Sequence, residues 1–399
     1  MKKKYRGRKV KHTKRLYVRR KSLPKKILSV AIVIVIIGGL GFVGYSIAPP
    51  LIKFFKGLGK DNDDSSSKVW TPPEVSSSQT DSSKNDSSEP DKQTQDAKTM
   101  TLTKESLLSE QALKDALVKA KNSGYLEVAA PLKIQGGELY FKTENATAVK
   151  AKAVKGTLTA SQIVSIIKES GLKSAAQLSI LNDNLAPRAD YQIGYKFENQ
   201  ETMWLDNSPD RGGKPWMSPF SQQAKTYITQ LIDELGTAGF TKFITTDYVF
   251  PNFLPGDLNY IGAIVKDANR KNALIAFAQL VKTDVDKYKG QTIIKMSAVD
   301  SIAGKSEVFV PASLNGLTIS TQIDVATLPP KITLKDNSVI DLSTLNIYDR
   351  VKTITTKISE LCGEEKIIPV LNTAGLSQPD IDSATKALTD LGYKSFIIA

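Results

Sequence analysis

Short apolar runs alternate with amphipathic segments from about residue 98 to the end of the chain. The short runs are rich in Val, Ile, Thr and aromatic residues and are bounded by turn residues, which is typical of β-strands. They predict eight strands, over Met100–Thr103, Tyr125–Pro131, Lys173–Leu181, Phe240–Thr246, Thr292–Ala298, Leu317–Ile323, Ile367–Leu371 and Ser395–Ile398.

Between these runs, apolar residues recur at the three- and four-residue spacing of a helix face, as in Ile163, Ile166 and Ile167. Thr159 and Ser377 are suited to cap the first turns of two such helices. The predicted helices are Glu110–Asn122, Ala160–Ser170, Gln222–Ala238, Lys271–Lys287, Tyr348–Leu361 and Pro379–Leu391.

Strands that alternate with helices in this number predict an α/β fold, a TIM-like (β/α)8 barrel over residues 100–399. Residues 302–316 are poorly helical, so the barrel unit after the fifth strand is expected to be irregular. A doubly wound open sheet is the structural alternative, but no G-x-G-x-x-G sequence follows any strand.

The N-terminal part of the chain has a different pattern. Residues 1–26 hold 14 of the 54 Lys and Arg residues and no acid, so the rest carries 40 basic residues against 41 acidic ones. Residues 27–48 are uncharged and long enough to span a bilayer, and they lack a signal-peptidase site before Pro49. They predict an uncleaved transmembrane signal anchor in the cell membrane, with a basic cytoplasmic tail and an extracytoplasmic domain.

The basic tail has a second interpretation, as a patch that contacts anionic lipid or RNA. The nearly neutral remainder argues against a nucleic-acid-binding fold. Residues 49–99 are rich in Ser, Asp and Lys, with few apolar residues, and predict a disordered extracytoplasmic linker between the anchor and the barrel.

The rarest residues exclude several kinds of chemistry. The chain has one Cys (Cys362) and one His (His12), and His12 lies in the basic tail. The predicted barrel therefore cannot contain a Ser-His-Asp or Cys-His nucleophile or a His-ligated zinc, and no metal or other cofactor is expected. Its chemistry must come from carboxylates, Tyr, Lys or backbone groups.

Several polar residues follow predicted strands, and the carboxyl ends of barrel strands are where (β/α)8 enzymes carry their active sites. Asp247 and Tyr248 directly follow the fourth strand. The other strand-end candidates are Asn182 and Asp183 after the third strand, Asp300 after the fifth, Asp324 after the sixth and Asn372 after the seventh. Glycoside hydrolysis needs two such carboxyl groups. The alternative is that an individual Asp caps the helix after its strand.

Trp204 and Trp216 flank a Gly-, Asp- and Pro-rich loop on the expected pocket side. Their indole faces could stack on sugar rings, as could the ring of Tyr248. Alternatively, both Trp side chains anchor the long loop to the barrel.

The segment from Trp204 to Pro251 reads W-L-D-N, then P-W-M-S-P-F-S, then F-I-T-T-D-Y-V-F-P. It resembles the glycoside hydrolase domain family of bacteria, whose matching segments read W-L-(D/N), W-x-(N/S)-P-(Y/F)-S and F-D-Y-x-R-F-P. The resemblance implies a TIM barrel in which Asp247 is the nucleophile or general acid, with Asp183 or Asp300 as its partner. Tyr248, Asp324, Asn372 and the two Trp residues would then bind substrate.

The chain also departs from that family pattern. No acidic cluster follows its second strand, Gln177 stands where the family has Arg, and Asp300 is displaced by one position. Two functions are therefore expected. The first is a membrane-anchored hydrolase of an extracytoplasmic polysaccharide. The second is a non-catalytic barrel that binds cell-wall glycan or another envelope partner.

Overall fold

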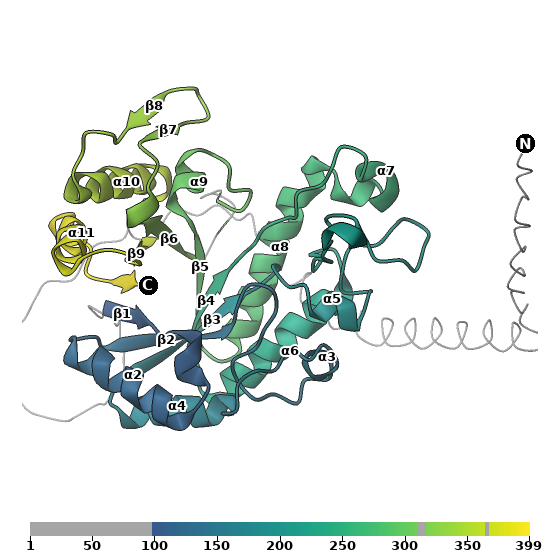
Figure 1. Cartoon of the computed structure of the whole chain (residues 1–399), viewed down its shortest axis with the longest axis horizontal. Helices are drawn as coiled ribbons and strands as arrows, with labels where there is room; N and C mark the ends of the chain where they lie inside the picture. The colour runs from purple at the N-terminus through teal and green to yellow at the C-terminus, as the bar shows by residue number, and fades with distance from the viewer. Residues whose placement is uncertain (1–97, 310–313, 315–316, 364–366) are drawn as a thin grey trace, which may run out of the picture. The chain divides into compact units, whose positions relative to one another are not determined.

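The computed structural model describes residues 98–309, 314, 317–363 and 367–399. Eight parallel strands form a closed barrel in the order β1-β10-β9-β6-β5-β4-β3-β2 (Figure 1). These strands are β1 (Lys98–Thr101), β2 (Glu127–Lys133), β3 (Lys173–Ser179), β4 (Lys242–Thr246), β5 (Gln291–Ser297), β6 (Thr318–Asp324), β9 (Ile367–Asn372) and β10 (Phe396–Ile398). The predicted closed barrel and its eight strands are confirmed.

Helices follow the strands and cover the barrel from outside (Figure 1). The long ones are α2 (Glu110–Asn122), α4 (Ala160–Glu169), α6 (Gln222–Ala238), α8 (Asp267–Asp286), α10 (Ile347–Cys362) and α11 (Gln378–Asp390). In α4, Thr159 and Gln162 form a capping box, and Ile163, Ile166 and Ile167 are buried. This is the face that the sequence pattern predicts, because a helix places residues three and four apart on one side.

The sequence pattern did not predict the shorter elements. They are the helices α3 (Ala146–Lys150), α5 (Ala186–Ala189), α7 (Leu258–Ile261) and α9 (Ala298–Ile302), and the antiparallel hairpin of β7 (Lys331–Thr333) and β8 (Val339–Asp341). Helix α9, which follows β5, has five residues. The irregular barrel unit expected after the fifth strand is thus present.

Two apolar layers hold the barrel together. Inside it, six small or branched side chains meet: Ala129, Ala175, Ile244, Ile293, Val370 and Ile397. The opposite faces of the strands pack against the helices in two larger clusters. The barrel centre is therefore filled, and the site must lie at one of its ends.

Strand β1 begins at Lys98, two residues before the domain start expected from the sequence. The predicted basic tail 1–26, transmembrane segment 27–48 and nearly all of linker 49–99 lie outside the described residues. Within the described part of the chain, no helix is long and apolar enough to cross a membrane.

Candidate active site

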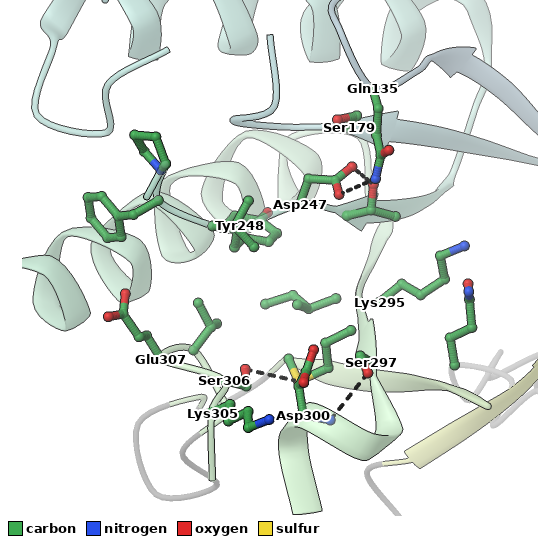
Figure 2. Close-up of a pocket in the computed structure, with 18 of the residues that line it drawn as sticks. Gln135, Ser179, Asp247, Tyr248, Lys295, Ser297, Asp300, Lys305, Ser306 and Glu307 are labelled. Atoms are coloured by element: carbon green, nitrogen blue, oxygen red, sulfur yellow. Dashed lines mark hydrogen bonds between the residues drawn. The ribbon is translucent and has the colours of Figure 1, made fainter. Parts of the chain in front are cut away.

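A cavity of about 990 Å³ opens at the carboxyl end of the barrel (Figure 2). Its walls come from the ends of β2 to β6 and from the loops that follow β4 and β5. The polar residues that line it are Lys133, Gln135, Gln177, Ser179, Thr246, Asp247, Tyr248, Asn252, Arg270, Lys295, Ser297, Asp300, Lys305, Ser306, Glu307 and Gln322. This is the end of the barrel where the sequence predicts chemistry.

Asp247 is half-buried in this cavity, and two hydrogen bonds orient its carboxylate. Gln135 Nε2 donates to Oδ1 at 2.8 Å, and Thr246 Oγ1 donates to Oδ2 at 2.7 Å. The backbone of Asp247 is in the left-handed region, with φ at 61°. Such a conformation costs energy for a residue with a side chain and is enriched at functional sites. The Asp247 side chain lines the cavity.

The loop that carries Gln135 is fixed to the end of β3. Gly136 donates its N–H to the carbonyl of Asn182 at 2.8 Å, and its own carbonyl accepts from the N–H of Asn184 at 3.1 Å. A Cβ atom on Gly137 would lie 2.2 Å from Asp183 Oδ1, so only glycine fits beside this carboxylate. These contacts hold the loop of Gln135, whose amide donates to Asp247, against the end of β3.

Asp183 does not line the cavity, and its side chain is fully buried. Its Oδ2 lies 3.0 Å from Nζ of buried Lys133, and its Oδ1 accepts the N–H groups of Leu185 and Ala186, each at 2.9 Å. Its position after a strand predicts a catalytic role. In the structure, Lys133 and two backbone N–H groups contact its two oxygens beneath the cavity surface. A structural bulge between Pro131 and Lys133 turns the lysine toward this carboxylate.

Asp300 and Glu307 lie on the wall opposite Asp247 (Figure 2). Asp300 is exposed in the first turn of α9, which Ser297 caps by accepting the Asp300 N–H at 3.2 Å. The Asp300 carbonyl accepts the N–H groups of Lys305 at 2.8 Å and Ser306 at 3.3 Å. These bonds fold the next segment back onto the cavity and bring half-buried Glu307 to it.

The sequence analysis missed Glu307 and Gln135. Glu307 lies in the segment expected to be poorly helical, eight or more residues beyond its strand, where strand-end reasoning does not reach. Gln135 lies two residues beyond the end of β2, and it is not one of the acids that the strand-end pattern selects. The only sequence signal for Gln135 is the Gly-Gly pair after it, which marks a tight turn.

Asp324 and Asn372 end neighbouring strands β6 and β9 and contact each other. Asn372 Nδ2 and Gln322 Nε2 both donate to Asp324 Oδ1, each at 2.7 Å. Gln322 lines the cavity, whereas Asp324 and Asn372 lie beside its lining. Burial lowers the pKa of Lys295 on β5, while the charges of Asp247 and Asp324 oppose this shift. Lys295 therefore lies in the field of both carboxylates.

The aromatic candidates have different places. Trp204 is 2% exposed and packs edge-on against Tyr195 and beside Phe253, so it belongs to a buried aromatic cluster. Its face is unavailable for stacking on a sugar. Half-buried Trp216 donates from Nε1 to Asp206 Oδ2 at 2.8 Å and lines a separate small hollow. Both residues hold the long loop before α6, which is the structural alternative given above.

Tyr248 lines the cavity but its hydroxyl group is turned inward. The side chain is 7% exposed, and its hydroxyl donates to Thr245 Oγ1 at 3.1 Å. Burial raises the pKa of Tyr248 well above its usual value.

Among the described residues, no group of three or more His, Cys, Asp or Glu is arranged to hold a metal ion. The cavity chemistry of this part of the chain rests on carboxylates, amides and lysines.

Three matches to solved structures have TM-scores below 0.5. The glycoside hydrolase domain of PelA from Pseudomonas aeruginosa is 14% identical, covers 70% of this chain and 89% of its own, and has a TM-score of 0.38. A hypothetical protein from Ruminiclostridium thermocellum is 15% identical over 46% of this chain and 91% of its own, with a TM-score of 0.38. The chitobiase of Flavobacterium johnsoniae is 12% identical over 69% of this chain, with a TM-score of 0.45, and the match spans 38% of that protein.

No curated protein sequence matches the chain. A family model described as "Putative glycosyl hydrolase domain" matches residues 99–301, which is more than half of the 399 residues. The match runs from β1 to α9 and includes Asp247 and Asp300, whereas Glu307 lies beyond it. It confirms the family that the Trp204–Pro251 motifs resemble. The chain therefore belongs to the family of putative glycosyl hydrolase domains.

Proposed function

We propose that the barrel hydrolyses glycosidic bonds of a polysaccharide, with Asp247 as its central catalytic group. The observation that carries this proposal is the half-buried Asp247 carboxylate, oriented by Gln135 and Thr246 and facing a cavity of about 990 Å³. Membership in the glycosyl hydrolase family supports the same reaction. A cavity of this size accommodates more than one sugar ring.

The hydrogen bonds to Asp247 favour one of its two possible roles. Both oxygens act as acceptors, which is the pattern of an ionised carboxylate. An ionised carboxylate is suited to act as nucleophile or general base, rather than as the group that protonates the leaving oxygen. We therefore assign Asp247 the nucleophile or base role.

A second carboxyl group must protonate the leaving oxygen from the opposite side of the scissile bond. Asp300 and Glu307 both lie on the facing wall (Figure 2). We assign the proton donor role to Asp300, which lies within the family match, and treat Glu307 as the competing donor. Asp183 is not part of this set, because its oxygens are engaged by Lys133 and two backbone N–H groups.

A non-catalytic function has one specific observation in its favour. Three glutamine amides, of Gln135, Gln177 and Gln322, line the cavity, and the acidic cluster that the family carries after its second strand is absent from this chain. Amides donate and accept hydrogen bonds to sugar hydroxyls without supplying an acid or a nucleophile. A barrel that binds glycan is therefore the second candidate.

The proposed substrate is an extracytoplasmic polysaccharide, because the sequence of residues 1–48 favours a signal anchor with its basic end in the cytoplasm. This part of the proposal rests on residues outside the described structure. It predicts that the barrel meets cell-wall or environmental glycan rather than a cytoplasmic sugar.

The test is a panel of polysaccharides and cell-wall fragments incubated with the full-length chain in detergent, with product analysis by mass spectrometry. On a substrate that is cleaved, Asp247→Asn should lower kcat by about 1,000-fold or more, equivalent to about 4 kcal/mol of barrier. Asp300→Asn should lower kcat strongly and Glu307→Gln should not. The reverse result would move the proton donor role to Glu307. Full turnover by Asp247→Asn would refute the catalytic assignment.

If the chain cleaves none of the panel but binds a glycan, the non-catalytic candidate is supported instead. In that case Gln177→Ala and Gln322→Ala should weaken glycan binding. Gln378→Ala, on exposed α11 away from the cavity, is the matched control.

A further inference from the structure

Lys295 occupies a central position in the barrel mouth. It lies two residues after Ile293, which packs inside the barrel, so its side chain is on the inner face of β5. It lines the cavity together with Gln177 from β3 and Gln322 from β6. Figure 2 shows the side chain extended from β5 on the barrel side of the cavity.

Among the residues that the structure describes, the amine of Lys295 has no partner, in contrast to the other shielded lysines of the barrel strands. Nζ of Lys133 contacts Asp183 Oδ2 at 3.0 Å and Ser179 O at 2.8 Å. Nζ of Lys242 contacts the Glu127 carboxylate at 2.6 and 2.7 Å. No hydrogen bond or ion pair joins Lys295 Nζ to any residue that the structure describes.

An unpaired ammonium in a partly desolvated site is unfavourable, and its neutral form is correspondingly favoured. Burial lowers the pKa of Lys295, with Asp247 and Asp324 opposing the shift. The neutral amine carries a lone pair and is nucleophilic. Loss of the Lys295 proton breaks no ion pair with any residue that the structure describes.

Each of the two strands that neighbour β5 carries one carboxylate at its carboxyl end. Asp247 follows β4 and Asp324 ends β6, and these strands are the two neighbours of β5 in the barrel. Gln322 and Asn372 fix Asp324, while Gln135 and Thr246 fix Asp247. The charges of both carboxylates act on Lys295, and carboxylates are among the side chains that exchange protons in general acid–base chemistry.

We propose that Lys295 is a carbonyl-reactive amine that forms an imine with an aldehyde or ketone of a hydroxylated ligand, such as an open-chain sugar. The amine attacks the carbonyl carbon, the C–N bond forms, and the carbonyl electron pair moves to oxygen, which takes up a proton. The nitrogen loses a proton to a flanking carboxylate. The hydroxyl then leaves as water, after receiving a proton, and a second N–H proton is lost. One amine and one carbonyl give one imine and one water, and no oxidant or reductant is needed.

The cavity lining indicates the ligand class. Gln135, Gln177 and Gln322 present amides around the amine, and amides suit the hydroxyl groups of a sugar or a sugar-like aldehyde. An anionic ligand is disfavoured, because Asp247 and Asp324 already place two negative charges near one lysine. The proposal does not depend on hydrolysis, since imine formation requires no glycosidic bond.

The test uses glyceraldehyde and sodium cyanoborohydride with the full-length chain in detergent, at pH 7 and for short times. Cyanoborohydride reduces the imine to a stable secondary amine, which peptide mass spectrometry locates. We expect Lys295 to be modified several times faster than Lys305, an exposed lysine of the same cavity that serves as the internal reference. Lys295→Met should remove this fast modification, and Lys305→Met should leave it unchanged.

Equal or slower modification of Lys295 relative to Lys305 would overturn the proposal. This comparison is made on the wild-type chain, so it does not require that Lys295→Met folds. Raising the pH to 9 should narrow the difference between the two lysines, since exposed lysines then also carry more neutral amine. If the ratio of the two modification rates is the same at pH 7 and pH 9, access of the reagent rather than the neutral amine governs the reaction. That result would also count against the proposal.

Discussion

The buried pair of Lys133 and Asp183 distinguishes a structural carboxylate from a catalytic one. Asp183→Asn keeps the volume of the side chain and an oxygen for the N–H groups of Leu185 and Ala186. It replaces Oδ2 by an amide group that faces Lys133 Nζ across about the same 3.0 Å, so two donors oppose each other. Both side chains are fully buried, so the lysine cannot reach water without moving the loop.

Removing one partner of a buried ion pair costs about 3–5 kcal/mol, since the other charge is left uncompensated. The unfolding entropy is about 2.1 cal/mol/K per residue, or about 0.6 kcal/mol/K over the roughly 300 residues of the barrel. The expected fall in Tm is therefore about 5–8 °C. Urea unfolding should show a lower midpoint with an unchanged slope, because the surface exposed on unfolding stays the same.

Calorimetry and urea titration of the full-length chain in detergent measure this loss. The matched control is Asp286→Asn, which breaks an exposed pair with Lys282 on α8 and should cost less than about 1 kcal/mol. A double variant with Lys133→Met and Asp183→Asn should recover part of the loss, because no ammonium is then buried without a counter-charge. An unchanged Tm in Asp183→Asn, together with lost glycan turnover, would refute the structural assignment.

Three further predictions concern pH, folding and topology. The raised pKa of buried Tyr248 means that its hydroxyl stays neutral in the folded chain, while the unfolded tyrosine ionises near pH 10. Its contribution to stability is thus complete below about pH 10 and lost as the pH rises further, so Tyr248→Phe should lessen the fall in Tm between pH 9 and 11. A fragment of residues 98–399 should unfold cooperatively in circular dichroism, since it begins at β1 and contains all eight strands of the barrel; an aggregated fragment would contradict the domain boundary. A tag after Ala399 should be cleaved by protease on intact cells and one before Lys2 protected, and the opposite result would overturn the predicted anchor orientation.

The comparison of Asp183 with Asp247 shows where sequence reasoning reached its limit. Both residues follow a barrel strand, so their strand-end position does not distinguish them. The bulge in β2 brings Lys133 under the first, and the second has a left-handed backbone and lines the cavity. Neither the pairing across strands nor the backbone angle can be read from one strand's residues, because each depends on a neighbour distant in sequence.

The sequence by itself determined the elements and the barrel. The spacing of residues such as Ile163, Ile166 and Ile167 gives the buried helix faces, and eight strands that alternate with six helices leave few other ways to cover both faces of a parallel sheet. It also determined that the barrel has no histidine to use. These properties are local, or follow from composition.

Only the tertiary structure decided which side chains share the cavity. Glu307 reaches it because backbone bonds to Asp300 fold an irregular segment back. Trp204 is buried in an aromatic cluster formed by the segments that follow β3 and β4. Lys295 has no partner in the described part of the chain, while Lys133 and Lys242 each contact an acid from another segment. The physical reason is the same in each case: the partner of a polar or aromatic side chain is set by packing between segments far apart in the chain, and that packing has no local signature.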